Sequence, residues 1–202
     1  MTNTVVVTGF EPFGNSTINP SQEVVNKIKE MQLDGLKVET AILPVVFGES
    51  SAKLLKLVDE IQPNFVICLG QAEGRSVISV ERFAINLNDA RIADNAGNWL
   101  SDQEVIPGAP LALTSTLPVK AIVQSIKDAG IPAEVSLSAG TFVCNHIFYA
   151  LQHKLQITNT KSGFIHLPVL PEQSEFQGKP TMELDQMVAG ILVGIRTAIN
   201  HS

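Results

Sequence analysis

The chain has 202 residues, of which 45% are hydrophobic and only 17% are charged. This composition is sufficient to bury the core of a single globular domain over residues 1–202, and it excludes a disordered chain. The net charge is -6 and lysines and arginines do not cluster, so neither nucleic acid nor an anionic membrane surface is an expected partner.

Signals for export, membrane insertion and metal binding are missing from the sequence. The polar start is followed by an apolar run too short for a signal peptide, and no run reaches the about 18 apolar residues of a membrane span. We therefore expect a cytoplasmic protein. Two cysteines in different local contexts and four scattered histidines form neither a disulfide framework nor a zinc-binding spacing, so no metal or other cofactor is expected.

Apolar runs and amphipathic stretches alternate along the chain. Strands are expected at 5–7, 38–43, 65–69, 77–85, 135–137 and 163–167, and helices at 20–32, 49–61, 118–129, 144–155 and 184–199. Asn19 and Pro20 are typical of the N-cap and the first residue of a helix. The alternation predicts an α/β fold, and we expect a single-domain three-layer α/β/α sandwich with a mixed, mainly parallel central sheet.

Two regions stand out against this pattern. The strand at 65–69 is apolar throughout, which is typical of a central strand, so Cys68 in its middle is interpreted as a core residue. Residues 86–117 are rich in Asn, Asp, Gly and Pro and show little periodicity. Loops of this length inside a compact domain are usually functional or interfacial.

The stretch 138–146 contains Cys144 at the point where a strand pattern changes to a helix pattern. The change of period falls at Gly140 and Thr141, which predicts that the Cys144 sulfur lies at a helix N-terminus. Unpaired backbone N–H groups and the helix dipole favour a thiolate there, so Cys144 is a candidate nucleophile. The alternative interpretation is a small buried hydrophobic residue.

A cysteine nucleophile needs a base, and four histidines are available. His146 is two residues after Cys144, which on a helix turns it by about 200°. His153 is further along the helix and His201 is in the terminal segment. His166 ends a strand, and we expect it at the sheet edge where the turn before Cys144 also lies. The alternative interpretation of His166 is a core histidine that is held by hydrogen bonds.

The base needs an acid to orient it, and Glu81 fits because it is embedded among apolar residues. Asp89 and Asp94 are more easily explained as turn formers. Glu81 has an equally weighted alternative as one half of a structural salt bridge with a nearby arginine, namely Arg75, Arg82 or Arg91. Backbone N–H groups at the helix start around Cys144, together with Arg91, are candidate donors to an oxyanion.

Five groups of motifs then resemble one known family in order and along essentially the whole chain. They are TGFEPFG at 8–14 with NPS at 19–21, GQAEGR at 70–75, ERFAINLNDARI at 81–92, SAGTFVCNH at 138–146, and FIHLP at 164–168 with PEQ at 171–173. The chain resembles the pyroglutamyl peptidase I family of cysteine peptidases.

The resemblance implies an exopeptidase that removes an N-terminal pyroglutamyl residue from peptides through a Cys-His-Glu triad and an acyl-enzyme, with Cys144, His166 and Glu81 in those roles. It implies that Phe10 and Phe13 sandwich the lactam ring. The remaining implied pocket residues are Phe142, Val143 and Ile92, with the Gln71 backbone carbonyl and the Asn19 side chain binding the lactam amide. Asn19 would then serve both as helix cap, through its oxygen, and as lactam donor, through its NH₂.

The resemblance also implies a homo-oligomer, either a tetramer or a dimer. The chain departs from the family pattern at Gln22, Val45 and Val169, of which Val45 borders the expected pocket. Two alternatives to the enzyme stay open: a non-catalytic binder of N-terminally blocked peptides on the same fold, and a redox sensor that uses Cys144.

Overall fold

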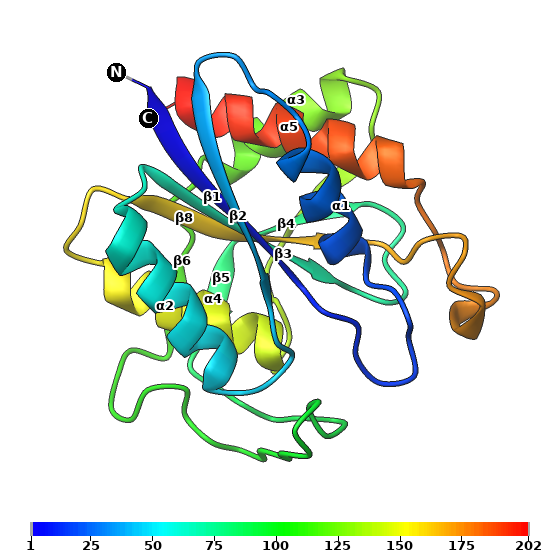
Figure 1. Cartoon of the computed structure of the whole chain (residues 1–202). Coiled ribbons are helices and arrows are strands. Elements are labelled where there is room, and N and C mark those ends of the chain that lie inside the picture. The colour runs from blue at the N-terminus through cyan, green and yellow to red at the C-terminus, as the bar shows by residue number, and fades with distance from the viewer. Residues whose placement is uncertain (1, 202) are drawn as a thin grey trace.

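The structure, a computed structural model, describes residues 2–201 and contains a six-stranded central sheet with helices on both faces (Figure 1). In sheet order the strands are β2 (Leu36–Leu43), β1 (Asn3–Phe10), β3 (Phe65–Gln71), β8 (Lys161–Leu167), β4 (Ile78–Glu81) and β7 (Ala133–Ser136). A separate two-stranded sheet pairs β5 (Phe83–Ile85) with β6 (Ala112–Thr114). The helices are α1 (Pro20–Lys29), α2 (Glu49–Ile61), α3 (Val119–Asp128), α4 (Val143–Leu155) and α5 (Leu184–Asn200), with a short 3-10 helix η1 (Ser174–Phe176).

The direction of the strands changes once across the sheet. β2, β1, β3 and β8 pair in parallel, and β4 pairs in parallel with β7. β4 is antiparallel to β8, with Ser79 opposite His166, so β4 and β7 both run against the other four strands. The expected mixed, mainly parallel sheet between two helix layers is confirmed.

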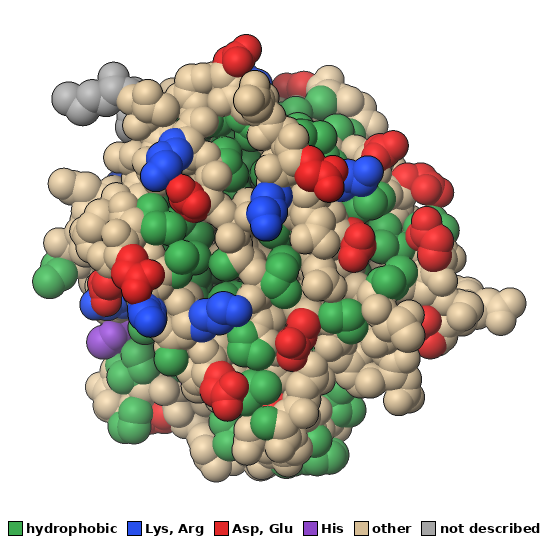
Figure 2. Space-filling model, viewed as in Figure 1, with side chains coloured by type: hydrophobic (Ala, Val, Ile, Leu, Met, Phe, Trp, Pro, Cys, Tyr) green, Lys and Arg blue, Asp and Glu red, His purple; other side chains and the backbone are tan. Residues whose placement is uncertain are grey.

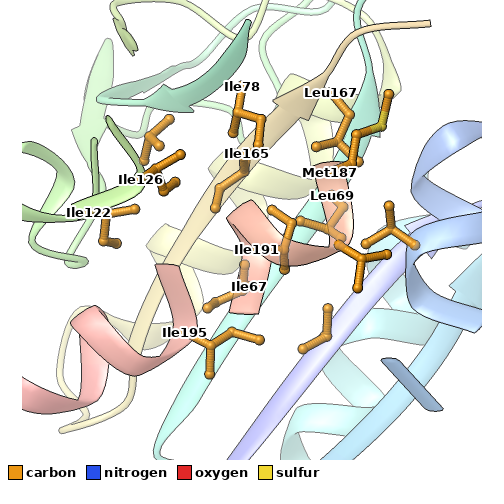
Figure 3. Close-up of a cluster of buried hydrophobic side chains, with 14 of the residues drawn as sticks. Ile67, Leu69, Ile78, Ile122, Ile126, Ile165, Leu167, Met187, Ile191 and Ile195 are labelled. Carbon is orange, nitrogen blue, oxygen red and sulfur yellow. The ribbon is translucent and has the colours of Figure 1, made fainter. Parts of the chain in front are cut away.

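One core lies between the sheet and helices α1, α3 and α5. Figure 3 shows its centre, where Met187, Ile191 and Ile195 of α5 lie over Ile67 and Leu69 of β3. These five side chains are almost completely buried. The apolar side of α5 therefore covers this face of the sheet.

The second core lies on the opposite face, under α2 and α4. Here Val66 and Cys68 of β3 and Phe164 of β8 pack with side chains of α4 such as Phe148 and Leu151. Because successive strand residues point to opposite faces, His166 lies on the same face as Phe164, and their rings are 4.8 Å apart. This alternation directs the polar side chains of the central strands toward the start of α4.

Cys68 is fully buried in the middle of β3, as predicted. Burial raises the pKa of its thiol to about 12, with Thr8 opposing that shift. Cys68 is therefore a core residue that carries a neutral thiol.

The cap of the first helix is also as predicted. Asn19 is the N-cap of α1 and Pro20 is the first helical residue. The Asn19 Oδ1 accepts hydrogen bonds from the backbone N–H of Ser21 at 3.0 Å and from its hydroxyl at 2.8 Å. The helix ends at Lys29, shorter than the expected 20–32.

The prediction of one continuous strand at 77–85 is wrong, because this stretch forms two strands that belong to two different sheets. β4 ends at Glu81 and β5 begins at Phe83. The backbone of Arg82, between them, bonds to two different segments: its N–H donates to the Ser136 carbonyl, and its carbonyl accepts from Ser115 N–H. The residue pattern of 77–85 cannot reveal that its two halves have different partners.

The 86–117 segment is more ordered than a plain loop, since it contains β6 and is held by side-chain amides and carboxylates. The Asn145 side chain of α4 bonds to the backbone of Ile85 and Leu87. Asp94 accepts from the N–H groups of Phe47 at 2.9 Å and Asn98 at 2.8 Å, which confirms its interpretation as a turn former.

On the face of the molecule shown in Figure 2, acidic and basic side chains are interspersed, with no broad basic patch. Within residues 2–201, no helix is long and apolar enough to cross a membrane.

Candidate active site

Cys144 is the second residue of α4 and follows a turn in which Gly140 has a positive φ of 78°. Its sulfur lies directly against the backbone of β3, because a Cβ added to Gly70 would be only 2.9 Å from Sγ. Gly70 pairs with His166 across the sheet. The nucleophile candidate, Cys144, and the base candidate, His166, therefore both lie beside Gly70.

The turn at Gly140 and Thr141 lines the same cavity as His166, as predicted. The strand before that turn, β7, nevertheless runs in the opposite direction to β8. The last residue of β7, Ser136, pairs with Glu81 of β4. The residue before Glu81, Val80, is opposite Ile165, so β7 ends beside the interior of β8 and not beside its end. The segment 137–142 therefore brings the chain back toward His166, and α4 starts there.

The charge state of Cys144 depends on opposing effects. Burial raises the pKa of its thiol to about 12, and the negative charge of Glu81 acts in the same direction. Arg75 and the Cys144 N–H at the helix start lower the pKa, but their effect is smaller. The predicted effect of the helix start is therefore present, but burial outweighs it, and the resting sulfur is a neutral thiol that needs a base.

His166 and Glu81 form a buried pair. Nδ1 of His166 lies 2.7 Å from Oε1 of Glu81, and both side chains are at most 5% exposed. Ser79 is directly opposite His166, so Glu81, two residues later on the same face of β4, is its diagonal neighbour. A carboxylate can only accept, so Nδ1 carries the proton and Nε2 is left as a basic nitrogen.

Burial lowers the pKa of His166 below its ordinary value. The hydrogen bond and the charge of Glu81 act against this shift, and the positive charge of Arg75 adds to it. His166 is therefore a neutral imidazole near neutral pH, which is the form that can accept a proton from a thiol.

The structure also realises the alternative interpretation of Glu81 as an ion-pair partner. Arg75 Nη1 lies 2.8 Å from the same Oε1 that binds His166. Of the three arginines considered, Arg75 is the one paired with Glu81. The histidine contact and the salt bridge coexist on one carboxylate oxygen.

The other histidines have structural contacts. His146 faces away from the site, as its spacing from Cys144 predicted: Nδ1 lies 3.1 Å from the Asn88 side-chain oxygen and Nε2 lies 3.1 Å from the Ser51 hydroxyl. Burial lowers the pKa of His146 to about 4. His201 contacts the carbonyl of Thr197.

A cavity of about 820 Å³ opens in front of Cys144 and His166. Every predicted substrate-pocket residue lines it, namely Phe10, Phe13, Asn19, Gln71, Ile92, Phe142 and Val143, and so does the candidate oxyanion donor Arg91. Glu81 is absent from the lining because it lies behind His166. Val45, a position that departs from the family pattern, lines the cavity too.

Aromatic side chains form one side of the cavity. The ring centroids of Phe13 and Phe142 are 6.3 Å apart, and Phe47 meets Phe142 edge-on at 5.3 Å. Phe10 is almost fully buried at the end of β1, whereas Ile92 is 45% exposed. The lining thus combines a fixed aromatic part from the core with a more accessible part from the 86–117 segment.

The polar residues of the pocket are held by their own hydrogen bonds. Asn19 Nδ2 donates to the Glu11 carbonyl at 3.0 Å, which leaves its second N–H for another acceptor. The Gln71 side-chain oxygen accepts from Gln173 Nε2 at 3.0 Å. Gln173 also accepts from the N–H of Leu170 at 2.8 Å, so it ties the segment after β8 to the end of β3.

Sequence reasoning from the single residues missed several positions that organise the site. Gly70 and Gln173 each act through close contacts that join distant segments, and so does the second contact of Arg75, with the Ser138 carbonyl; nothing in the local sequence indicates these partners. Glu11 is a similar case: its Oε1 accepts from Asn95 Nδ2 at 2.9 Å, which links the loop after β1 to the 86–117 segment.

Comparison with known proteins agrees with the geometry. The family model described as pyroglutamyl peptidase matches residues 3–201. Pyrrolidone-carboxylate peptidase of Escherichia fergusonii is 51% identical over 198 residues, which cover 97% of this chain and 92% of that protein. Pyrrolidone-carboxylate peptidase of Bacillus thuringiensis is 48% identical over 195 residues, which cover 95% of this chain and 91% of that protein.

Solved structures show the same agreement. The crystal structure of pyroglutamyl peptidase I from Bacillus amyloliquefaciens superimposes with a TM-score of 0.94 at 42% identity and covers 98% of this chain and 95% of that one. A mutant pyrrolidone carboxyl peptidase from Pyrococcus furiosus gives 0.94 at 40% identity, with 98% and 99% covered. The chain therefore belongs to the pyroglutamyl peptidase family of cysteine peptidases.

Proposed function

We propose that this enzyme hydrolyses the amide bond after an N-terminal pyroglutamyl residue of peptides, with Cys144 as nucleophile, His166 as base and Glu81 as the group that orients His166. Family membership supports the removal of N-terminal pyroglutamate. The observation that carries the residue roles is that His166, whose Nδ1 lies 2.7 Å from Glu81 Oε1, lines the same cavity as Cys144.

The proton positions define the first chemical step. His166 Nε2 takes the proton of the Cys144 thiol as the sulfur attacks the pyroglutamyl carbonyl, because both groups are neutral at rest. The C–N bond then breaks, and the protonated His166 gives its proton to the leaving amine. Glu81 stabilises the imidazolium that exists between these two transfers.

The second half of the reaction releases the acyl group. His166 removes a proton from water, the hydroxide attacks the thioester, and the C–S bond breaks to give pyroglutamate and the Cys144 thiol. The developing oxyanion in both halves would be bound by the Cys144 N–H at the start of α4 and by Arg91. Loss of one such donor typically lowers the rate by a factor of about 10² to 10³.

The cavity suits a small flat lactam. Phe10 and Phe13 offer aromatic faces, and each stacking contact contributes about 0.5 to 1.5 kcal/mol. Phe142, Val143 and Ile92 complete the apolar lining. The free N–H of Asn19 would bind the lactam carbonyl, and the Gln71 backbone carbonyl would accept from the lactam N–H, so substrates without these groups would leave buried polar atoms unpaired.

A fluorogenic pyroglutamyl amide tests the proposal, with wild type and Cys144→Ser compared at equal concentration. We expect the wild type to release the fluorophore and the variant to be inactive. An inert wild type that still binds pyroglutamyl peptides would establish the non-catalytic binder instead. Full activity in Cys144→Ser would remove the nucleophile assignment.

Three further points belong to the same proposal. The chain would act as one domain over residues 1–202, in the cytoplasm, and as a homo-oligomer, either a tetramer or a dimer. A redox role for Cys144 is disfavoured because the other cysteine, Cys68, is fully buried. Native mass spectrometry measures the oligomeric state, and a monomer at working concentration would contradict that part.

A further inference from the structure

Arg75 lies in the segment between β3 and β4, and its side chain reaches back to the reaction centre. Its Nη1 donates to Glu81 Oε1 at 2.8 Å, and its Nη2 donates to the backbone carbonyl of Ser138 at 3.1 Å. The side chain is 24% exposed and lines the cavity. One guanidinium therefore contacts two segments that are 57 residues apart in the chain and that meet at the site.

Each of the two contacts has a direct link to the chemistry. Glu81 has no exposed surface, and a carboxylate removed from water needs a paired charge. At rest the neutral His166 cannot supply that charge, whereas Arg75 can. Ser138 begins the 138–142 segment that leads into α4, so the second contact fixes the approach of Cys144 to His166.

We propose that Arg75 is a positioning residue of the reaction, which joins the Glu81–His166 pair to the segment that presents Cys144. This inference rests on the proposed function for its kinetic consequences. Arg75 itself takes no part in bond making or breaking. The planar fork of the guanidinium suits this double contact, and a lysine could hold only one side of it.

The charged groups around His166 support the role of the arginine charge. Glu81 on β4, Arg75, and the thiol of Cys144 on α4 face the imidazole, while β3 presents Gly70 beside it. Glu73, Asp89, Arg91 and Glu175 line the same cavity further away. Burial lowers the pKa of His166 and Glu81 raises it, while the charge of Arg75 adds to the lowering, so loss of Arg75 would raise that pKa.

The first test is kinetic and uses Arg75→Gln, Arg75→Lys and Arg82→Gln. Arg82 follows Glu81 on the chain but does not line the cavity, so Arg82→Gln removes the same charge nearby as a matched control. For Arg75→Gln we expect kcat to fall by about 10- to 100-fold, the range for groups that orient a functional histidine in metal sites, with little change in KM. The acid limb of kcat/KM should move to higher pH.

Arg75→Lys should keep the acid limb of the wild type, because the charge remains, but lose rate because the contact with Ser138 is lost. Arg82→Gln should match the wild type in both respects. An acid limb that does not move in Arg75→Gln, or full kcat in Arg75→Lys, would overturn the proposal. Should Arg75→Gln lose its fold by circular dichroism, Arg75→Lys carries the test of the contact.

The second test does not need activity. The ring signals of His166 are followed by NMR as a function of pH in wild type and in Arg75→Gln, with a His166→Gln spectrum for assignment. We expect His166 to titrate at higher pH in Arg75→Gln, and an unchanged titration would refute the charge effect. If the wild type is inert toward the pyroglutamyl amide, the proposed function fails while this titration still decides the role of Arg75.

Discussion

Replacing Gly70 with alanine tests how the central sheet positions the sulfur of Cys144. The added Cβ would lie 2.9 Å from Cys144 Sγ and 2.7 Å from Cζ of Phe164, whereas ordinary contacts are 3.4–4 Å. The sulfur must then retreat by about 0.5 to 1 Å, and the Phe164 ring must also move in a packed core. A misplacement of about 1 Å typically costs about 10²-fold in rate, so we expect kcat to fall by that order.

Gly163→Ala is the matched control for crowding. Its Cβ would lie 2.6 Å from both Leu117 Cδ1 and Ser115 Oγ, away from the cysteine. Overpacking costs about 1–3 kcal/mol, so both variants should melt at lower temperature than the wild type. Steady-state hydrolysis of a pyroglutamyl amide, measured well below both melting temperatures, separates the two effects. Wild-type kcat in Gly70→Ala, or an equal loss in Gly163→Ala, would refute the reasoning.

Four other predictions follow from the same contacts. Glu81→Gln should lower kcat by up to about 10⁴-fold and move the acid limb of kcat/KM to lower pH, because the carboxylate raises the pKa of His166. In the wild type that limb should lie below the ordinary histidine value of about 6.5, and a limb above it would contradict the lowered pKa. Asn95→Ala should raise KM more than it lowers kcat, because it removes the bonds from Asn95 to the Glu11 carboxylate and the Pro12 carbonyl and so loosens the loop that carries Phe13; an unchanged KM would show that this link does not shape the pocket. The rate of alkylation of Cys144 by iodoacetamide without substrate should keep rising with pH beyond 9, since the thiol pKa is about 12, and a plateau near neutral pH would reveal a resting thiolate.

Local patterns in the sequence predicted the elements well, because those elements depend on neighbours in the chain. The helix cap at Asn19 and the buried Cys68 follow from one segment each, and both are confirmed. The exclusion of His146 followed from helix geometry alone, and its contacts with Asn88 and Ser51 agree.

The properties that local patterns did not reveal depend on partners from elsewhere in the chain. Strand direction is one, since the reversal of β7 depends on the antiparallel pairing of β4 with β8. The charge state of Cys144 is another: the helix start favours a thiolate, but burial against β3 and the nearby Glu81 outweigh it. Neither the depth of the sulfur nor the position of Glu81 relative to it can be read from the residues around Cys144.

The site was predicted partly from single residues and partly from the family resemblance. Reasoning from single residues left Glu81 divided between orienting His166 and pairing with an arginine, and the structure contains both contacts on one oxygen. The pocket residues came from the family resemblance, because an aromatic such as Phe13 in a loop carries no local sign of its ligand.

The acyl-enzyme is the central claim, and rapid quenching followed by mass spectrometry tests it most directly. Wild type is mixed with a pyroglutamyl ester or amide, quenched in acid during the first turnover, and digested. We predict that the peptide containing Cys144 gains the mass of one pyroglutamyl acyl group, and that Cys144→Ala gains none. Turnover without any adduct on Cys144, or an adduct at another residue, would contradict the account.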